Sequence, residues 1–175
     1  MYYINYFFIL SFIGHLIETF VVKSNSGILF GWWTPVYGLG SVIILLINKY
    51  ISKLNINKVS KVILLFISCS FILTIIEAIG GYLIEFIFGI TFWDYTDYKF
   101  NIGKYITLEI TIIWGLSSII LIYYIKPLLD KIISKIPKYF TYTLIILFII
   151  DVISTLFIKS KITDITILHQ IFFTF

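Results

Sequence analysis

Residues 59–88 read VSKVILLFISCSFILTIIEAIGGYLIEFIF, with Lys61, Glu77 and Glu85 as the only charged side chains. Thirty residues of helix measure about 45 Å, whereas the hydrocarbon core of a bilayer is about 30 Å thick. The stretch therefore predicts a membrane-spanning helix that tilts strongly, projects beyond the bilayer or breaks at Gly80-Gly81, because a glycine pair is a common kink site.

The composition of the whole chain indicates a membrane protein. Its 175 residues are 60% hydrophobic and 13% charged, with a mean hydropathy of +1.04, whereas soluble domains are about 45–50% apolar and about 25% charged. We predict an all-α polytopic transmembrane bundle, a single domain over residues 1–175, with about five spanning helices at Tyr2–Val22, Val36–Ile51, Val59–Phe88, Tyr105–Ile125 and Tyr139–Ile158. The tail 162–175 is too short to span and predicts an interfacial helix.

The basic residues indicate an orientation in the membrane. All thirteen are lysines at the ends of apolar segments, a pattern that orients membrane proteins and does not indicate nucleic-acid binding. Eight of them share one side with the N-terminus and five lie on the other side. We therefore expect a cytoplasmic N-terminus; the eight are Lys49, Lys53, Lys58, Lys61, Lys126, Lys131, Lys135 and Lys138.

Acidic residues recur inside the apolar segments, where an acid at a helix centre costs about 2.5–3.5 kcal/mol. Glu77, Gly81, Glu85 and Gly89 follow at four-residue intervals and form a slowly winding stripe on one helix. Acids of the other segments fall in the same half of the bundle, and no lysine lies in the middle of a segment. We predict a cluster whose acids are protonated, share protons, hydrogen-bond to tyrosine, tryptophan or histidine, or hold a solute or cation. Its members are Glu77, Glu85, Glu18, His15 and Glu109.

Each of these residues also has a structural interpretation. Glu18, Glu85 and Glu109 lie near segment ends, where they would be solvated by headgroups or cap helices. Asp151 would equally hydrogen-bond a neighbouring helix. His15 shares a helix face with Glu18, but a single histidine more often packs than binds a metal, and no spacing here is diagnostic of a metal.

Two unusual connections, Gly27–Gly40 and Gly89–Lys104, lie on the same side as the acids. The first is rich in glycine and aromatic residues, and its proline starts the next helix; the second is short, polar and aromatic. The tryptophans of the first connection would alternatively form an aromatic belt at the membrane interface. Asp94 and Asp97 in the second connection would alternatively cap a helix or form a turn. We predict that the two connections form the mouth of the site through Trp93, Asp94, Tyr95, Asn101, Pro35 and Tyr37.

The sequence gives weak support to an enzyme. It contains no serine-histidine-aspartate arrangement, zinc-ligand spacing or phosphate-binding loop. Its single cysteine, Cys69, excludes an intramolecular disulfide. We expect no cofactor apart from a bound cation.

The ordered glycines, acids and aromatic residues resemble a bacterial membrane-protein family called putative ABC-transporter type IV, or putative ABC transporter permease. The resemblance covers about residues 8–137, without the fifth helix and the tail. It rests on Gly14, Glu18, Gly27, Leu29, Gly31, Pro35, Tyr37, Gly38, Gly40, Glu77, Gly81, Glu85, Gly89, Trp93-Asp94-Tyr95, Phe100-Asn101-Ile102, Trp114-Gly115 and Pro127.

This chain departs from the family pattern at two arginine positions. Ser26 stands where the family usually has an arginine before the first loop's glycine, and Lys104-Tyr105 stand where it usually has Gly-Arg. Lysine supplies a positive charge without the planar fork of a guanidinium. The resemblance implies transport in a bacterial cytoplasmic membrane.

Three functional hypotheses follow. The leading one is a permease-like protein that binds a cationic or polar small solute in an acid-lined cavity open toward the outer leaflet. Five helices without an internal repeat are few for an alternating-access carrier, and the chain has no P-loop. We therefore expect the chain to form a homodimer or to bind a separate ATP-hydrolysing subunit. Membrane lipid is a further expected partner. The alternatives are a membrane enzyme or metal-binding protein that uses the same acids, and a non-catalytic assembly subunit.

Overall fold

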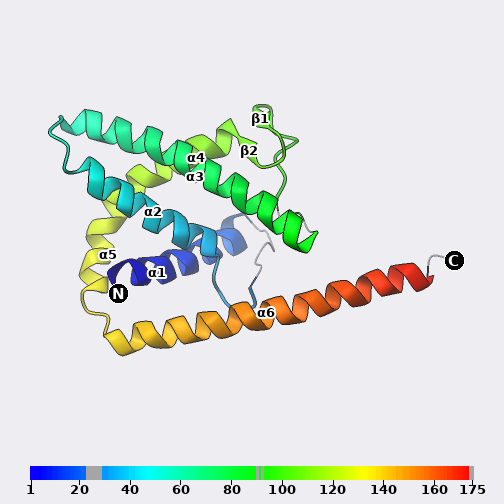
Figure 1. The fold of residues 1–175 in the computed structure, drawn as a ribbon. Helices are drawn as coiled ribbons and strands as arrows, with labels where there is room; N and C mark the ends of the chain where they lie inside the picture. The colour runs from blue at the N-terminus through cyan, green and yellow to red at the C-terminus, as the bar shows by residue number, and fades with distance from the viewer. Residues whose placement is uncertain (23–28, 90, 92, 174–175) are drawn as a thin grey trace.

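A computed structural model describes residues 1–22, 29–89, 91 and 93–173, with the backbone alone for residues 22, 88 and 159–173. The described chain is almost entirely helical (Figure 1). Its elements in chain order are α1 (Tyr2–Ile17), the π-helical η1 (Glu18–Val22), α2 (Pro35–Ile51), α3 (Lys58–Phe88), β1 (Asn101–Ile102), β2 (Ile106–Thr107), α4 (Leu108–Ile120), the π-helical η2 (Leu121–Ile125), α5 (Lys126–Ile133) and α6 (Lys138–Phe173).

The prediction of an all-α membrane bundle is confirmed. Within the described residues, four helical stretches are long and apolar enough to cross a membrane: Tyr2–Val21, Lys58–Ile87, Leu108–Ile133 and Lys138–Ile158. The remaining expected span, α2, is an apolar helix of 17 residues, about 25 Å long. The chain is therefore a multi-pass membrane protein.

Helix α3 runs without a break through Gly80-Gly81, so of the three alternatives the break at this glycine pair is wrong. The helix begins where the Asn57 side chain accepts a hydrogen bond from the Ser60 N–H at 2.8 Å, a helix-capping contact. It ends at Gly89, whose φ of +64° is a left-handed conformation that glycine adopts without strain. Since α3 has 31 residues, it must tilt or project beyond the bilayer.

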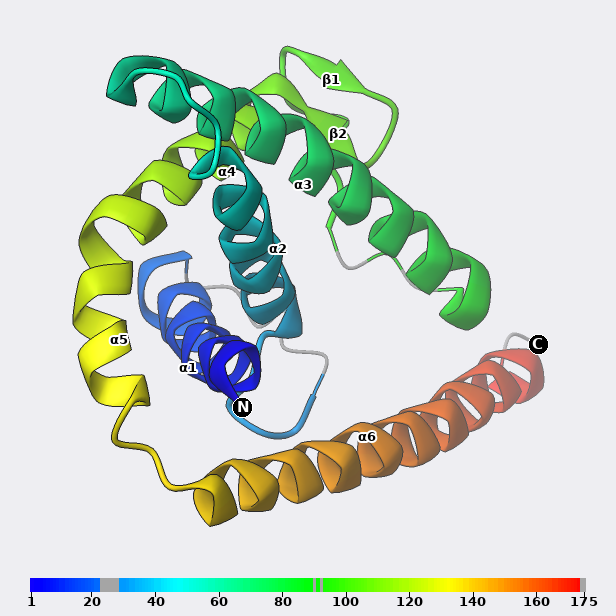
Figure 2. The same cartoon turned by 60° about the vertical axis from the view of Figure 1, so that its left-hand side comes forward.

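The fourth helical segment begins and ends later than expected. Tyr105 is not helical, because it lies in an unforeseen antiparallel hairpin of β1 and β2. After this hairpin α4 continues through η2 into α5 as far as Ile133, and the chain curves between α4 and α5 (Figure 2). Pro127 lies in the first turn of α5; because proline has no N–H, a change of hydrogen-bond pattern is expected beside it.

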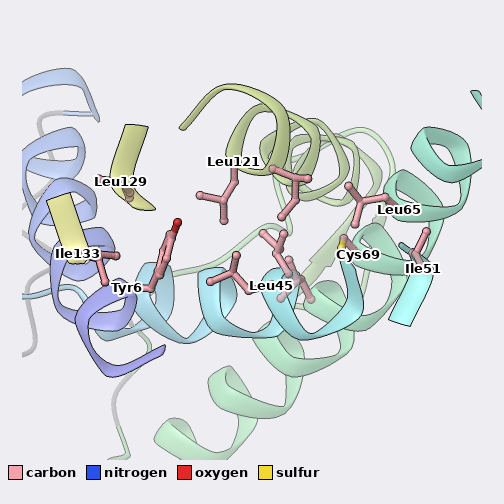
Figure 3. Close-up of a cluster of buried hydrophobic side chains, with 11 residues drawn as sticks. Tyr6, Leu45, Ile51, Leu65, Cys69, Leu121, Leu129 and Ile133 are labelled. Carbon is pink, nitrogen blue, oxygen red and sulfur yellow. The ribbon is translucent and has the colours of Figure 1, made fainter. Parts of the chain in front are cut away.

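Helices α1 to α5 pack around one apolar core (Figure 3). Close approach between α1 and α2 depends on small residues. A Cβ placed on Gly38 would lie 2.6 Å from the carbonyl oxygen of Phe7, and one on Gly14 would lie 2.4 Å from the ring of Tyr37. The core consists of Tyr6, Ile44, Leu45, Ile51, Leu65, Cys69, Leu73, Leu121, Ile122, Leu129 and Ile133.

Helix α6 crosses one side of the bundle and leaves many of its large apolar side chains exposed (Figure 2). A buried hydrogen bond of 2.7 Å from the Thr141 hydroxyl to Asn5 Oδ1 joins its first turns to α1. The helix continues to Phe173, so residues 162–173 extend the fifth helix and do not form a helix of their own, while their position at the membrane interface stays a prediction. The physical reason for the extension is that no glycine or proline interrupts residues 138–173.

Candidate functional site

Glu77 joins three elements of the bundle through its two carboxylate oxygens. Its Oε1 accepts a hydrogen bond of 2.7 Å from the Tyr95 hydroxyl, which belongs to the connection after α3. Its Oε2 accepts a hydrogen bond of 2.7 Å from Trp114 Nε1 on α4. Each carboxylate oxygen therefore has one neutral donor, and α3, α4 and the connection meet at this side chain.

Glu18 joins the same assembly through aromatic side chains. The Tyr37 hydroxyl on α2 donates to Glu18 Oε1 at 2.6 Å, and the Tyr37 ring lies 6.4 Å from the Trp114 ring, centroid to centroid. Gly40 leaves room for that tryptophan, since a Cβ there would approach its ring to 3.2 Å. We call Glu18, Tyr37, Trp114, Glu77 and Tyr95 the central network.

The Tyr95 side chain is held as a hydrogen-bond donor. Its backbone N–H donates to the Lys104 carbonyl oxygen at 2.8 Å, which fixes the connection against the hairpin. Burial and the nearby Glu77 carboxylate raise the pKa of the Tyr95 hydroxyl. The hydroxyl therefore stays protonated and acts as the hydrogen-bond donor to Glu77.

Glu85 belongs to a second assembly, the hairpin clamp, formed by Glu85, Thr91, Lys104 and Tyr105. Lys104 forms an ion pair with Glu85, and the Tyr105 hydroxyl donates to Glu85 Oε2 at 2.8 Å. Lys104 Nζ also donates to Thr91 Oγ1 at 2.7 Å, and its hydrogen bond with Glu85 raises the lysine pKa. Although no lysine lies in the middle of a segment, Glu85 has a cationic partner, because the hairpin brings Lys104 back onto α3.

Gly81 makes room for the hairpin clamp. A Cβ on Gly81 would lie 2.6–2.9 Å from three atoms of the Tyr105 ring, whereas a Cβ on Gly80 would meet nothing within 4 Å. The Tyr105 side chain is only 1% exposed, so it has little room to move. Gly81 thus admits the ring of Tyr105 against α3.

This neighbouring glycine pair provides a matched test of the packing. Gly81→Ala should lower the free energy of unfolding by about 1–3 kcal/mol, because the methyl group overpacks the site. Gly80→Ala should be neutral or stabilise by up to about 1 kcal/mol, since alanine favours helix. Thermal unfolding of both variants in detergent micelles measures the difference, and equal effects would contradict the packing at Tyr105.

The other predicted acids and the histidine have separate surroundings. Glu109 lies in the first turn of α4 and accepts a hydrogen bond from the Thr107 hydroxyl just before the helix, at a position where the helix dipole favours a negative charge. His15 is half-buried on α1, and among the described residues no hydrogen bond to its side chain is present. The described contacts connect neither residue to the central network.

The predicted mouth residues divide between turns and the central network. The N–H and hydroxyl of Thr96 donate to Asp94 Oδ1 at 2.8 and 2.7 Å, and these bonds lower the Asp94 pKa. Asn101 Nδ2 donates to the Gly103 carbonyl oxygen within the hairpin at 3.1 Å. The Trp93 ring packs 5.8 Å from that of Tyr105, and Pro35 begins α2. Tyr95 and Tyr37 alone among the predicted mouth residues contact the central acids through the described hydrogen bonds.

The described residues contain no group of three or more histidine, cysteine, aspartate or glutamate side chains that could hold a metal ion. The central network instead combines two carboxylates with three aromatic side chains. Such a combination suits an organic or hydrated cation better than a fully coordinated transition metal.

Asp151 has a role that the sequence reasoning missed. Its Oδ1 accepts from the Phe30 N–H at 3.0 Å and its Oδ2 from the Gly31 N–H at 2.9 Å, while the Thr155 hydroxyl donates to Oδ1 at 3.2 Å. We call these contacts the loop staple. The sequence suggested that Asp151 contacts a neighbouring helix, but its carboxylate binds the backbone of a loop. Because Asp151 and Gly31 are 120 residues apart, no local pattern in the sequence indicates their contact.

A second missed cluster lies at the other end of α1. The Tyr2 and Tyr6 hydroxyls each donate to Asp130 Oδ1 at 2.7 Å, and Lys126 Nζ lies 2.5 Å from Asp130 Oδ2. Only the four-residue spacing of Lys126 and Asp130 was a recognisable signal, because oppositely charged residues at this spacing share a helix face. The cluster attaches α5 to the start of α1.

Comparison with known proteins gives one family. The family model described as Putative ABC-transporter type IV matches residues 5–156. The match extends well beyond the expected limit at residue 137, so the resemblance includes most of the fifth spanning segment. No curated protein and no solved structure matches the chain significantly.

Proposed function

The chain belongs to the Putative ABC-transporter type IV family, and on this basis we propose that it binds and moves a cationic or polar small solute at Glu77. Membership of this family makes it a transport-related membrane protein. The solute and the residues that hold it are our proposal, which rests chiefly on one observation. Glu77 lies within a membrane-spanning helix with two neutral donors and, in the described part of the chain, takes part in no ion pair.

The chemistry of the central network supports a cation as the solute. A carboxylate offers about four positions that accept a hydrogen bond, two on each oxygen. Tyr95 occupies one position on Oε1 of Glu77, and Trp114 occupies one on Oε2. The remaining positions are able to accept hydrogen bonds from an ammonium group or a hydrated ion. The rings of Tyr37 and Trp114 add aromatic faces, which attract cations most strongly where water is excluded.

Other residues would support binding less directly. Glu18 adds a second negative group linked through Tyr37, whereas the charge of Glu85 is balanced by Lys104. In our proposal His15 and Glu109 assist from the same half of the bundle. Trp93 and Asp94, in the connection that carries Tyr95, flank the mouth.

The proposed assembly follows from the size of the chain. About five helices without an internal repeat are few for an alternating-access carrier. We therefore propose a homodimer or a complex with a separate ATP-hydrolysing subunit, in a bacterial cytoplasmic membrane with the N-terminus in the cytoplasm, as the lysine distribution favours.

Cation titration of a Glu77→Gln variant tests the proposal. Purified protein in detergent is titrated with tetramethylammonium, spermidine or sodium chloride at constant ionic strength, and the unfolding temperature reports binding. For the cation that stabilises the wild-type protein, Glu77→Gln should weaken the apparent affinity by about tenfold, or about 1.4 kcal/mol. Asp97→Asn, at an exposed acid of the connection after α3, should bind as the wild type does.

The result that rejects the proposed site is unchanged cation affinity in Glu77→Gln. Another result would favour an assembly subunit: a protein that co-purifies with the wild-type chain and is lost from Glu77→Gln, with no cation response in either. In that case Glu77 would pair with a basic side chain of the other protein.

A further inference from the structure

An open groove of about 490 Å³ lies where α5 meets α6. It is formed by the end of α5, the connection between the helices and the first residues of α6, at the corner visible in Figure 2. Since one spanning segment ends at Ile133 and the next begins at Lys138, this corner lies at a membrane boundary. The lining residues are Lys131, Ile132, Lys135, Ile136, Pro137, Tyr139 and Phe140.

The groove has an excess of positive charge. Lys131 and Lys135 both line it and are exposed, and neither takes part in an ion pair among the described residues. The nearest acid in sequence, Asp130, is already bound by Lys126 and by the hydroxyls of Tyr2 and Tyr6. Two ammonium groups are therefore available to an anion.

Large apolar side chains accompany these lysines. Ile132, Tyr139 and Phe140 line the groove and are 54%, 73% and 48% exposed. Turns in the connection fix its course, since the Lys135 N–H donates to the Ile132 carbonyl oxygen at 3.0 Å and the Ile136 N–H to that of Ile133 at 3.2 Å. Ammonium groups beside apolar surface at a membrane boundary match a phospholipid, which has an anionic phosphate above acyl chains.

We propose that this groove is a binding site for an anionic phospholipid. Lys131 and Lys135 bind the headgroup phosphate, and Ile132, Tyr139 and Phe140 contact the glycerol and the upper acyl chains. A zwitterionic lipid binds less well, because its own cationic group offsets the attraction of the lysines. This site is separate from the central network and does not depend on the proposed solute.

Lipid titration of the purified full-length protein tests the proposal. The protein in detergent is titrated with phosphatidylglycerol or with phosphatidylcholine of the same acyl chains, and native mass spectrometry counts the retained lipids. The wild-type protein should retain phosphatidylglycerol preferentially. The double variant Lys131→Gln/Lys135→Gln should weaken this binding by about tenfold, because each lysine contributes substantially to attraction for an anionic lipid.

Two controls distinguish the groove from general surface charge. Lys49→Gln/Lys53→Gln removes the same charge from exposed lysines in the last turn of α2 and just after it, which are predicted on the same side, and should leave binding unchanged. Lys131→Arg/Lys135→Arg keeps the charge and should retain the preference. Equal retention of the two lipids by the wild-type protein, or an equal loss in both glutamine variants, would overturn the proposal.

Discussion

Asp151→Ala is expected to lower the free energy of unfolding by about 3 kcal/mol, one of the two largest stability effects that we expect in this protein. The variant removes the acceptor for the N–H groups of Phe30 and Gly31, and hydrogen bonds to a charged group contribute about 1.5–3 kcal/mol each. Because both hydrogen bonds use one carboxylate, their contributions do not add fully, and the sum of two full contributions is an upper limit.

The depth of the loop explains why its backbone needs the loop staple. The Thr34 N–H donates to the Ser11 carbonyl oxygen at 3.0 Å, and Ser11 lies within the first spanning segment, Tyr2–Val21. The chain just before α2 therefore reaches into the bundle without being helical. At such depth backbone groups must find protein partners, because lipid offers none, and Asp151 supplies one carboxylate for two consecutive N–H groups.

A graded series of variants measures the contribution of the loop staple. Asp151→Asn keeps one acceptor oxygen and should destabilise about half as much as Asp151→Ala, while Asp97→Ala in an exposed turn should change little. Denaturant unfolding in micelles gives the free energies, and hydrogen exchange should show loss of protection at the Phe30 and Gly31 amides. Wild-type stability and protection in Asp151→Ala would mean that the staple does not hold the loop.

Sequence reasoning predicted the helices because each spanning segment contains a long apolar run, which is recognisable from local sequence alone. It failed where the structure depends on contacts between distant residues. The hairpin that places Tyr105 outside α4 pairs only two residues from each strand, which is too short for an alternating pattern. The pairs Asp151–Gly31 and Tyr6–Asp130 join residues 120 and 124 positions apart, so a single sequence has no means of identifying the partners.

Sequence reasoning selected the acids of the candidate site but gave no means of foreseeing their arrangement. The cost of an acid in lipid drew attention to Glu77 and Glu85, which share one stripe and look equivalent in the sequence. The connection after α3 makes them different, because it returns Tyr95 to Glu77 and Lys104 to Glu85. One acid thereby gains neutral donors and the other an ion pair, a distinction that depends on the course of the chain rather than on residue spacing.

Glu77→Leu is expected to lower the free energy of unfolding by about 2–5 kcal/mol. The leucine fills a similar space but leaves the Tyr95 hydroxyl and the Trp114 N–H without their acceptor. Each unsatisfied donor costs about 1–3 kcal/mol when it is buried. Denaturant unfolding in micelles measures the loss, and Glu77→Gln, which keeps one acceptor oxygen, should lose less.

Removing the donors as well should reverse much of this loss. In the triple variant Glu77→Leu/Tyr95→Phe/Trp114→Phe no donor remains unsatisfied, and replacing all partners of a buried hydrogen-bonded group by apolar groups is often nearly neutral. Recovery of at least half of the lost free energy would identify the unpaired donors as its cause. A triple variant less stable than Glu77→Leu would instead assign the loss to packing. Since the recovered variant is folded, its failure to respond to cations would assign the loss of binding to the polar groups of the central network and not to unfolding.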